Sequence, residues 1–455
     1  MLVAMKSFIA ISIFLCFRLI NSEPTLICEW THTSHKVCRD SDIIVSVEQH
    51  PNYHGKELQL INARGIADNA FKDLDIGGLI IKQNYTSYNM ENEVIRPPPP
   101  LSLFSESFNG LPNLTKLLFY DTKLIYKTNQ LAPLRQLKRL LLTNSDLTEV
   151  PSDMFPAVKN LSYLRISYNV IPVVRDNAFV SLTKLRTLEL VRNNMTTLEP
   201  GWSNGLDNLT ILDLTNNDLT LTPYVFSNLK KVRSLIMYHP AKPSGISPQA
   251  FRGLSSLTDL FLENDGILTL ESGMFDDSNE LKNIRIWFTT IHHVPTGVFN
   301  NLKSLTILSL VHSGIKSIEP GAFYGLNLTE LDLGTYGYNG KVIESGTFTQ
   351  LNVSFLSLNR NYIREIKPRA FDGLKARKLN LSFNSIKKLV ADTFAGAEIE
   401  IIDLRFNKID SIDENAFKDA KIRSLIVDPS SVIVGNETKW GIPESIKIEV
   451  SEEIF

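Results

Sequence analysis

The feature that most constrains this chain is a segment pattern that returns throughout most of its length. A clear copy is 209–219, where leucines and an asparagine follow the spacing LxxLxLxxNxL. An aromatic residue closes each copy, at steps of 23 to 25 residues: Phe155, Phe179, Trp202, Phe226, Phe251, Phe275, Phe299, Phe323, Phe348, Phe371, Phe394 and Phe417. A period sustained this long predicts a solenoid in which each repeat forms one coil.

Each LxL segment predicts a short β-strand with one buried face. Side chains alternate across a strand, so Leu212 and Leu214 point into the core while Asp213 points outward. One coil cannot bury its leucines alone, so the coils must stack. The stacked strands, about sixteen of them, are predicted to form one parallel sheet.

The asparagine of the pattern has a separate role. A tight turn inside a solenoid leaves buried backbone groups, and an amide side chain can both donate to them and accept from them. The column reads Asn169, Asn193, Asn217, Asn361, Asn384 and Asn407, with other residue types from Pro240 to Tyr336. We therefore expect less regular joining of the coils in that middle stretch.

The repeated LxxLxLxxNxL pattern and its closing aromatic residue resemble the leucine-rich repeat family over about 58–427. The resemblance is to the extracellular type of roughly 24 residues, found in Toll-like receptor ectodomains, Slit, chaoptin and secreted insect immune proteins. It implies an α/β-type solenoid: a leucine-rich repeat horseshoe with a concave parallel β-sheet and a mostly irregular convex side. It also implies extracellular recognition, although the family binds proteins, lipids and glycans alike.

We expect four parts along the chain. Residues 1–22 read as a cleaved signal peptide, because Lys6 precedes a short apolar run and the end is small and polar. An uncleaved anchor is the alternative. Residues 23–56 then form an N-terminal cap, 57–428 the repeats and 429–455 a C-terminal cap without cysteine. No transmembrane segment is expected, so the product would be secreted and extracellular.

The N-terminal cap carries Cys28 and Cys38, which are the two cysteines left after signal removal. An even pair in a secreted protein predicts a disulfide, here closing a hairpin over the first coil. The spacing of Cys28, His32, His35 and Cys38 also suits a zinc ion, and this remains the alternative.

A proline-rich insertion occupies about 85–101 and contains Pro97–Pro100. Four prolines are expected to stay out of the sheet and to form an extended exposed strand. The insertion is read either as a plain surface loop or as a lip that contacts a partner.

The sequence contains none of the motifs that we associate with catalysis or cofactors. The segments GxSxG and HExxH and glycine-rich phosphate loops are missing, so we expect neither an enzyme nor a cofactor or metal site. The formal net charge of −2 argues against a nucleic-acid partner.

Secretion would expose N-x-[ST] sequons to glycosylation. We expect glycans among Asn113, Asn160, Asn194, Asn208, Asn327, Asn352, Asn380 and Asn436. Asn380 lies between two core leucines, which places it on the concave face. A glycan there would block that end, so binding is expected nearer the N-terminus.

The outward positions turn aromatic in the middle of the array. The candidate partner-binding residues are Tyr238, His239, Phe261, Trp287, Phe288 and His312, which we expect to be contiguous. In the alternative, Trp287 and Phe288 fold back and replace the contacts between coils that the asparagine column, or ladder, lacks in this stretch. A basic stretch from Arg364 to Lys388 is read as a solvated flank or as a weak site for sulfated glycan or acidic lipid.

These observations predict a secreted protein that recognises an extracellular protein or receptor through its concave face. An innate-immune or receptor-modulating role follows from the resemblance. The alternatives are a pattern-recognition binder of lipid or glycan, and a matrix or adhesion protein that self-associates, for which a homodimer would be expected.

Overall fold

The structure is a computed structural model that describes residues 26–31, 34–52, 55–72, 74–83, 99–238, 245–263, 268–431, 433–435, 437–438 and 442–451. It forms two compact units: unit 1 is Met1–Leu147 with Pro151–Tyr163, and unit 2 is Thr148–Val150 with Leu164–Phe455. The expected signal peptide, 1–22, lies outside the described residues.

Unit 1 contains two sheets. One begins with antiparallel strands and continues with parallel ones, in the order β1 (Leu26–Thr31), β2 (His35–Asp40), β3 (Ile43–Gln49), β5 (Gly65–Ile66), β7 (Pro100–Leu103) and β9 (Lys123–Ile125). The other is formed by the first repeat strands, all parallel: β4 (Glu57–Ile61), β6 (Gly78–Lys82), β8 (Lys116–Tyr120) and β10 (Arg139–Thr143). A short 3-10 helix, Ser152–Ala157, belongs to the same unit.

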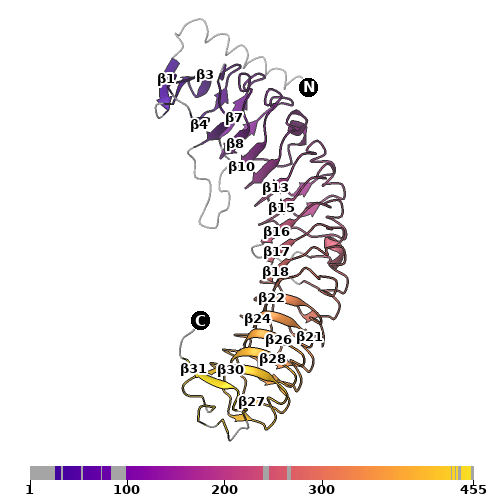
Figure 1. The fold of residues 1–455 in the computed structure, drawn as a ribbon. Helices are drawn as coiled ribbons and strands as arrows, with labels where there is room; N and C mark the ends of the chain where they lie inside the picture. The colour runs from indigo at the N-terminus through magenta and orange to yellow at the C-terminus, as the bar shows by residue number, and fades with distance from the viewer. Residues whose placement is uncertain are drawn as a thin grey trace. The chain divides into compact units, whose positions relative to one another are not determined.

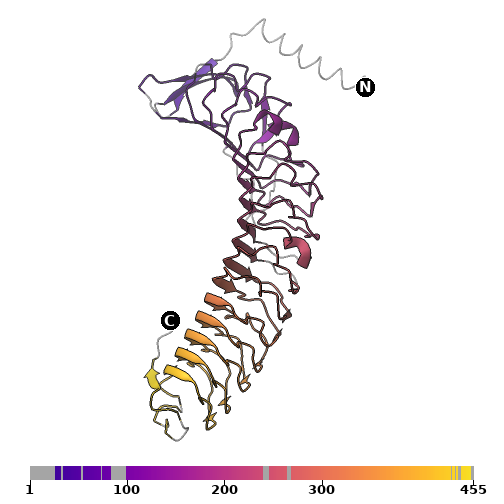
Figure 2. The same ribbon diagram turned by 45° about the vertical axis from the view of Figure 1, so that its right-hand side comes forward.

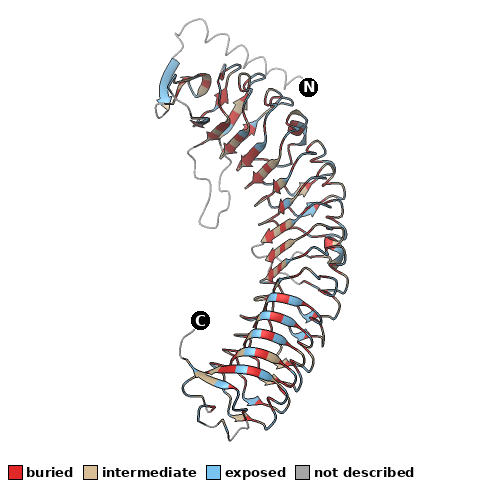
Figure 3. Ribbon diagram, in the orientation of Figure 1, coloured by how far each residue is buried: buried red, intermediate tan, exposed pale blue. Residues whose placement is uncertain are grey.

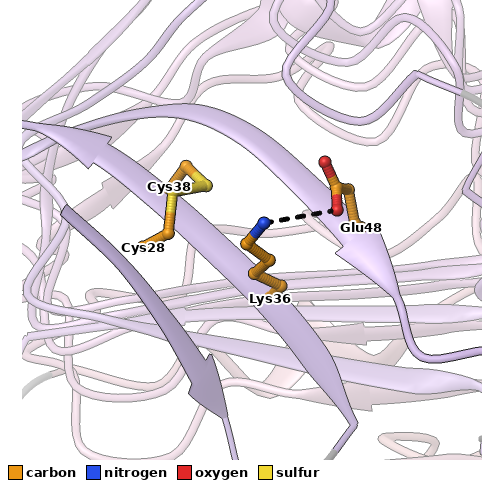
Figure 4. Close-up of a disulfide and its surroundings, with 4 residues drawn as sticks. All are labelled: Cys28, Lys36, Cys38 and Glu48. Carbon is orange, nitrogen blue, oxygen red and sulfur yellow. Dashed lines mark ion pairs between the residues drawn. A yellow bond between two sulfur atoms is a disulfide. The ribbon is translucent and has the colours of Figure 1, made fainter. Parts of the chain in front are cut away.

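The cap of unit 1 is a hairpin joined by a disulfide. Cys28 and Cys38 face each other in the antiparallel register of β1 and β2 and are bonded, as Figure 4 shows. On the neighbouring strand pair, the Lys36 ammonium lies 3.8 Å from the Glu48 carboxylate. His35 and Val37 share one face of β2 and are buried, so this face packs against the interior, whereas residues 26–30 of β1 are exposed.

The zinc alternative gains no support from the part of the cap that is described. His35 is fully buried, and its Nδ1 lies 3.1 Å from the Ser34 hydroxyl. Burial lowers the pKa of His35, because a charged imidazolium is disfavoured away from water. No cluster of three or more potential ligands occurs among the described residues, and His32 lies outside them.

The proline-rich insertion is described only from Pro99 onward. The expectation that its prolines stay out of the sheet is wrong for the last of them. Pro100 begins β7, and the Pro99 carbonyl accepts a hydrogen bond from the Lys123 amide at 2.9 Å. Proline lacks an amide proton but keeps its carbonyl, so it is tolerated as the first residue of a strand.

Unit 2 carries most of the repeats, whose strands lie side by side in one parallel sheet (Figures 1 and 2). The strands are β11 (Tyr163–Ser167), β13 (Thr187–Glu189), β15 (Ile211–Asp213), β16 (Ser234–Tyr238), β17 (Asp259–Glu263), β18 (Asn283–Trp287), β20 (Ile307–Ser309), β22 (Asn327–Asp332), β24 (Asn352–Ser357), β26 (Lys375–Asn380), β28 (Glu398–Asp403), β30 (Lys421–Val427) and β31 (Lys447–Val450). The parallel repeat sheet that the sequence predicts is confirmed.

The side of unit 2 opposite this sheet is almost free of helix in the described residues. It holds one short 3-10 helix, Pro248–Phe251, and small parallel strand pairs. The pairs are β12 (Val173–Val174) with β14 (Thr197–Leu198), β19 (His293–Val294) with β21 (Ser317–Ile318), β23 (Val342–Ile343) with β25 (Glu365–Ile366), and β27 (Lys388–Leu389) with β29 (Ser411–Ile412). The mostly irregular convex side that the sequence predicts is therefore confirmed. The short parallel strand pairs on it were not predicted.

The core follows the repeat pattern closely. Buried and partly exposed residues alternate along the strands, as the colours of Figure 3 show. All twelve closing aromatics, Phe155 to Phe417, are at most 4% exposed. From Phe251 onward they form a continuous row of neighbouring rings, and successive centroids lie between 5.4 Å (Phe394–Phe417) and 6.4 Å (Phe275–Phe299) apart.

The asparagine column joins each coil to its neighbours by hydrogen bonds. Asn217 donates from Nδ2 to the carbonyls of Leu190 and Leu214, at 2.6 and 2.9 Å. Its Oδ1 accepts from the amides of Asn193 and Met195, at 2.9 and 3.1 Å. One buried side chain thus pairs four backbone groups that would otherwise be left unpaired in the core.

Hydroxyl groups continue the column at Thr289 and Ser313, whereas Pro240 and Asp265 lie outside the described residues. Thr289 donates to Ser313 at 3.3 Å, and Ser313 donates to the Ile286 carbonyl at 2.9 Å. Tyr336 departs from the column, because its side chain is 45% exposed. The next residue, Gly337, takes the ladder residue's place in the backbone pattern, because its carbonyl accepts from the Ile315 amide at 2.8 Å as the Ser313 carbonyl accepts from the Ile291 amide.

We predict that Asn217→Ala lowers the free energy of unfolding by about 3 kcal/mol or more, because it leaves buried amides and carbonyls unpaired. Urea denaturation followed by circular dichroism measures the change. Thr220→Ala, which alters an exposed side chain of the same coil, should stay within about 0.5 kcal/mol of wild type. Equal stability of the two variants would contradict the role given to the asparagine column.

Candidate protein-binding site

Three of the candidate residues lie on adjacent strands of unit 2. Tyr238 ends β16, Phe261 lies in the middle of β17 and Trp287 ends β18. All three side chains are partly exposed on the outer surface of the sheet, which we call the sheet face. Neighbouring strands in a sheet are roughly 4.8 Å apart, so these rings share one surface. We call Tyr238, Phe261 and Trp287, together with Ile236 and Arg285, the sheet patch.

The strand register arranges the sheet patch in two rows. Ile236, Phe261 and Arg285 pair with one another across β16, β17 and β18. Two residues further along each strand, Glu263 lies between Tyr238 and Trp287. The patch therefore has an apolar and cationic row beside a row in which a carboxylate separates two aromatic rings.

Contacts between neighbouring strands restrain these rings. The Arg285 guanidinium lies 5.6 Å from the centre of the Phe261 ring, a cation–π arrangement. The Trp287 indole donates from Nε1 to the Ser309 hydroxyl at 2.8 Å. Burial raises the pKa of Tyr238, and the nearby carboxylates of Glu263 and Asp213 add to the rise while Arg285 opposes it.

Phe288 and His312 are not part of the sheet patch. They lie in the turns that follow β18 and β20, and their backbone φ angles are 50° and 54°. Their rings stack at a centroid distance of 4.6 Å, and Tyr336 and Tyr362 continue the series at 5.9 and 5.4 Å. We call these four residues the turn row. His239 lies outside the described residues.

The sequence already contained a signal for this separation. Phe288 and His312 stand immediately before the ladder position, as do Tyr168, Phe383 and Phe406, which also have positive φ angles. An aromatic residue at that position turns away from the strand because its backbone is left-handed. Their place in the repeat therefore already separates Phe288 and His312 from the strand residues.

The alternative in which Trp287 and Phe288 replace the ladder contacts does not fit the geometry. The hydroxyls of Thr289 and Ser313 make those contacts. Trp287 instead reaches Ser309 on the next strand, and Phe288 is 44% exposed.

Most of the described sequons share one place in the repeat. Five exposed asparagines lie at or just before the start of a repeat strand: Asn113, Asn160 and Asn208 precede β8, β11 and β15 by three residues, whereas Asn327 and Asn352 begin β22 and β24. Asn194 is exposed in a turn, whereas Asn436 lies outside the described residues. Asn380 is only 8% exposed, and its Oδ1 accepts from the Ser382 amide and hydroxyl. The exposed asparagines therefore lie away from the sheet patch.

The basic stretch is largely paired with carboxylates. Of its eight cations, five lie within 4 Å of a carboxylate oxygen: Lys367 with Glu365, Arg369 with Asp372, Arg377 with Glu400, Lys378 with Asp403 and Lys388 with Asp413. A groove of about 670 Å³ lies at the beginnings of β24 to β30, and it alternates Lys375, Glu398 and Lys421 along one wall. This pattern favours a solvated flank over a site for polyanions.

Comparison with known proteins agrees with the repeat geometry. A Leucine rich repeat family matches residues 135–195, 183–239 and 279–335, and a BspA type Leucine rich repeat region matches 316–438. Together these matches cover more than half of the chain. The chain belongs to the leucine-rich repeat proteins.

Two curated relatives illustrate the range of the similarity. A probable glycoprotein hormone G-protein coupled receptor of Anthopleura elegantissima is 30% identical over 136 residues, 30% of this chain and 15% of that protein. Keratocan of Danio rerio is 27% identical over 207 residues, 43% of this chain and 57% of that protein. The chain thus spans less than two thirds of either relative.

Among solved structures, the TLR13–ssRNA13 complex aligns with a TM-score of 0.64 and 23% identity, covering 87% of this chain and 61% of that one. This likeness concerns the fold. Within the described residues, no helix combines the length and the apolar character needed to cross a membrane.

The electrostatics of the sheet patch generate a prediction for Tyr238. A difference titration of phenol absorbance between wild type and Tyr238→Phe should give a midpoint above the ordinary value of 10.0, since burial and Glu263 favour the neutral phenol. Glu263→Gln should lower that midpoint, whereas Glu189→Gln, on the more distant β13, should not change it. An unchanged midpoint in Glu263→Gln would contradict the placement of Glu263 beside Tyr238.

Proposed function

We propose that this protein is a secreted leucine-rich repeat protein that recognises another extracellular protein through the sheet patch. The observation that carries the proposal is the partial exposure of Tyr238, Phe261 and Trp287 on three adjacent strands. Large aromatic anchors at the centre of an interface supply most of the binding energy in many protein complexes.

The rigidity of the surface supports a role in binding. The rings stand on strands of a continuous sheet, and Phe261 and Trp287 are further restrained by Arg285 and Ser309. Side chains that are already ordered lose little conformational entropy when a partner binds. A loop carrying the same residues would bind more weakly for this reason.

Secretion is proposed from three features of the chain. The first 22 residues have the pattern of a signal peptide, the cap contains the Cys28–Cys38 disulfide, and exposed sequons occur in both units. The similarity to a receptor and to other leucine-rich repeat proteins agrees with an extracellular setting. An innate-immune or receptor-modulating role remains a proposal at the level of the family resemblance.

A binding protein is also proposed in preference to an enzyme. The partly exposed groups of the sheet patch are aromatic rings, a guanidinium and a carboxylate in strand register, without a nucleophile held by a base. This arrangement suits a protein surface.

The proposal is tested by capture with the secreted, glycosylated protein. Partners cross-linked from extracellular fluid and cell surfaces are identified by mass spectrometry for wild type and for the double variant Phe261→Glu with Trp287→Glu. We expect a protein partner that the double variant loses, because two buried charges would oppose the interface.

The matched control is Phe355→Glu, which changes a partly exposed phenylalanine of β24 on the same sheet face. This control should retain the partner. A partner that survives the double variant would move the site elsewhere on the chain. Recovery of a lipid or glycan in place of a protein, or of further copies of this chain alone, would contradict recognition of a separate protein.

A further inference from the structure

The surroundings of the sheet patch carry a consistent negative charge. Asp213 of β15 pairs with Ile236 of β16, which in turn pairs with Phe261 of β17. In the neighbouring row, Glu263 lies between Tyr238 and Trp287. Asp259 occupies the outward position two residues before Phe261. Three carboxylates therefore surround the aromatic rings within four adjacent strands.

The same sign continues along the sheet toward β22. Glu330 and Asp332 take the next outward positions on β22, and the intervening outward residues of β20, Ile307 and Ser309, are uncharged. From β15 to β22, Arg285 is the one cation among the described outward strand residues. Five carboxylates are therefore opposed by a single guanidinium on this surface.

Ion pairs within the chain do not neutralise this charge. Arg285 lies over the Phe261 ring, and none of the five carboxylates pairs with a cation among the described residues. Arg233 and Lys282 immediately precede β16 and β18, on the flank of the sheet. Glu263 and Asp213, further along their strands, are the carboxylates closest in register to the aromatic rings.

Charge complementarity then identifies the occupant. We propose that the sheet patch binds a basic segment of a protein partner, with lysine or arginine side chains beside Glu263 and Asp213 and against the rings of Tyr238 and Trp287. This inference rests on the proposed function and names its partner class. An aromatic ring and a carboxylate within one row offer a cation both a π face and an ion pair.

The geometry also limits the segment and excludes polyanions. Four strands from β15 to β18 span roughly 14 Å, which an extended chain crosses with about four or five residues. Sulfated glycans and acidic lipids would meet carboxylates of like sign on this face. None of the described exposed sequons lies within β15, β16, β17, β18 or β20, so glycans leave the patch open.

The test uses the full secreted protein and a display library of random twelve-residue peptides. Selection is run on wild type and on two variants. The neutral variant is Asp213→Asn with Glu263→Gln, in which an amide oxygen can still accept from the Thr215 amide as Asp213 does. The aromatic variant is Phe261→Glu with Trp287→Glu. Circular dichroism and thermal unfolding confirm that each variant is folded.

We expect peptides enriched on wild type to carry an excess of lysine and arginine. The neutral variant should bind a selected peptide about tenfold more weakly, mostly through slower association, and raised salt should weaken wild type by a similar factor. The control Glu400→Gln, which neutralises a carboxylate of β28, should bind as wild type does.

Two other results separate the inference from the proposed function. Enriched peptides that are neutral or acidic, bind equally to the neutral variant and are lost on the aromatic variant would overturn the basic partner and leave the binding patch standing. If peptides are enriched no more strongly on wild type than on the aromatic variant, both the basic partner and the proposed binding patch are overturned.

Discussion

The structure depends on the pairing of buried backbone groups where each coil turns. The core that leucines and aromatic rings create excludes water, so amides and carbonyls at the turns must find partners inside it. Asn217 meets this requirement by pairing four such groups from its own and the preceding coil. Because one side chain must reach two coils at once, the length of each repeat is held near a constant value, and the strands fall into register.

Register is also what creates the candidate site. Outward positions are free of packing demands, yet the sheet brings each of them next to its equivalent on the neighbouring strand. Tyr238, Phe261 and Trp287 are far apart in sequence and close in space for this reason. Their surface combines apolar anchors with carboxylates, a composition that suits a basic protein segment better than a polyanion. The stability of the core and the chemistry of the sheet face are thus set by alternate residues of the same strands.

The sequence predicts the fold well because its signal is repeated. The period, the parallel sheet and the burial of the aromatics from Phe155 to Phe417 all follow from one pattern. Local departures are harder to foresee. Tyr336 occupies a ladder position by sequence spacing but is exposed, because the next residue, Gly337, takes the ladder residue's place in the backbone hydrogen bonds between coils. Pro100 begins a strand, and the carbonyl of the preceding Pro99 accepts a hydrogen bond from the Lys123 amide. For the site, sequence spacing places Tyr238, Phe261 and Trp287 correctly on strands, whereas Phe288 and His312 depend on the left-handed turn that separates them from the sheet.

The most direct test of this account is hydroxyl-radical footprinting of the native protein, read by mass spectrometry. The register places Trp287 and Phe261 on the sheet face, and it places Trp202 and Phe226 in the core, where both are fully buried. We predict rapid oxidation of Trp287 and Phe261, with Trp202 and Phe226 protected until the protein is unfolded by urea. Oxidation of Trp202 as fast as that of Trp287 in the native protein would contradict the arrangement on which both the fold and the candidate site depend.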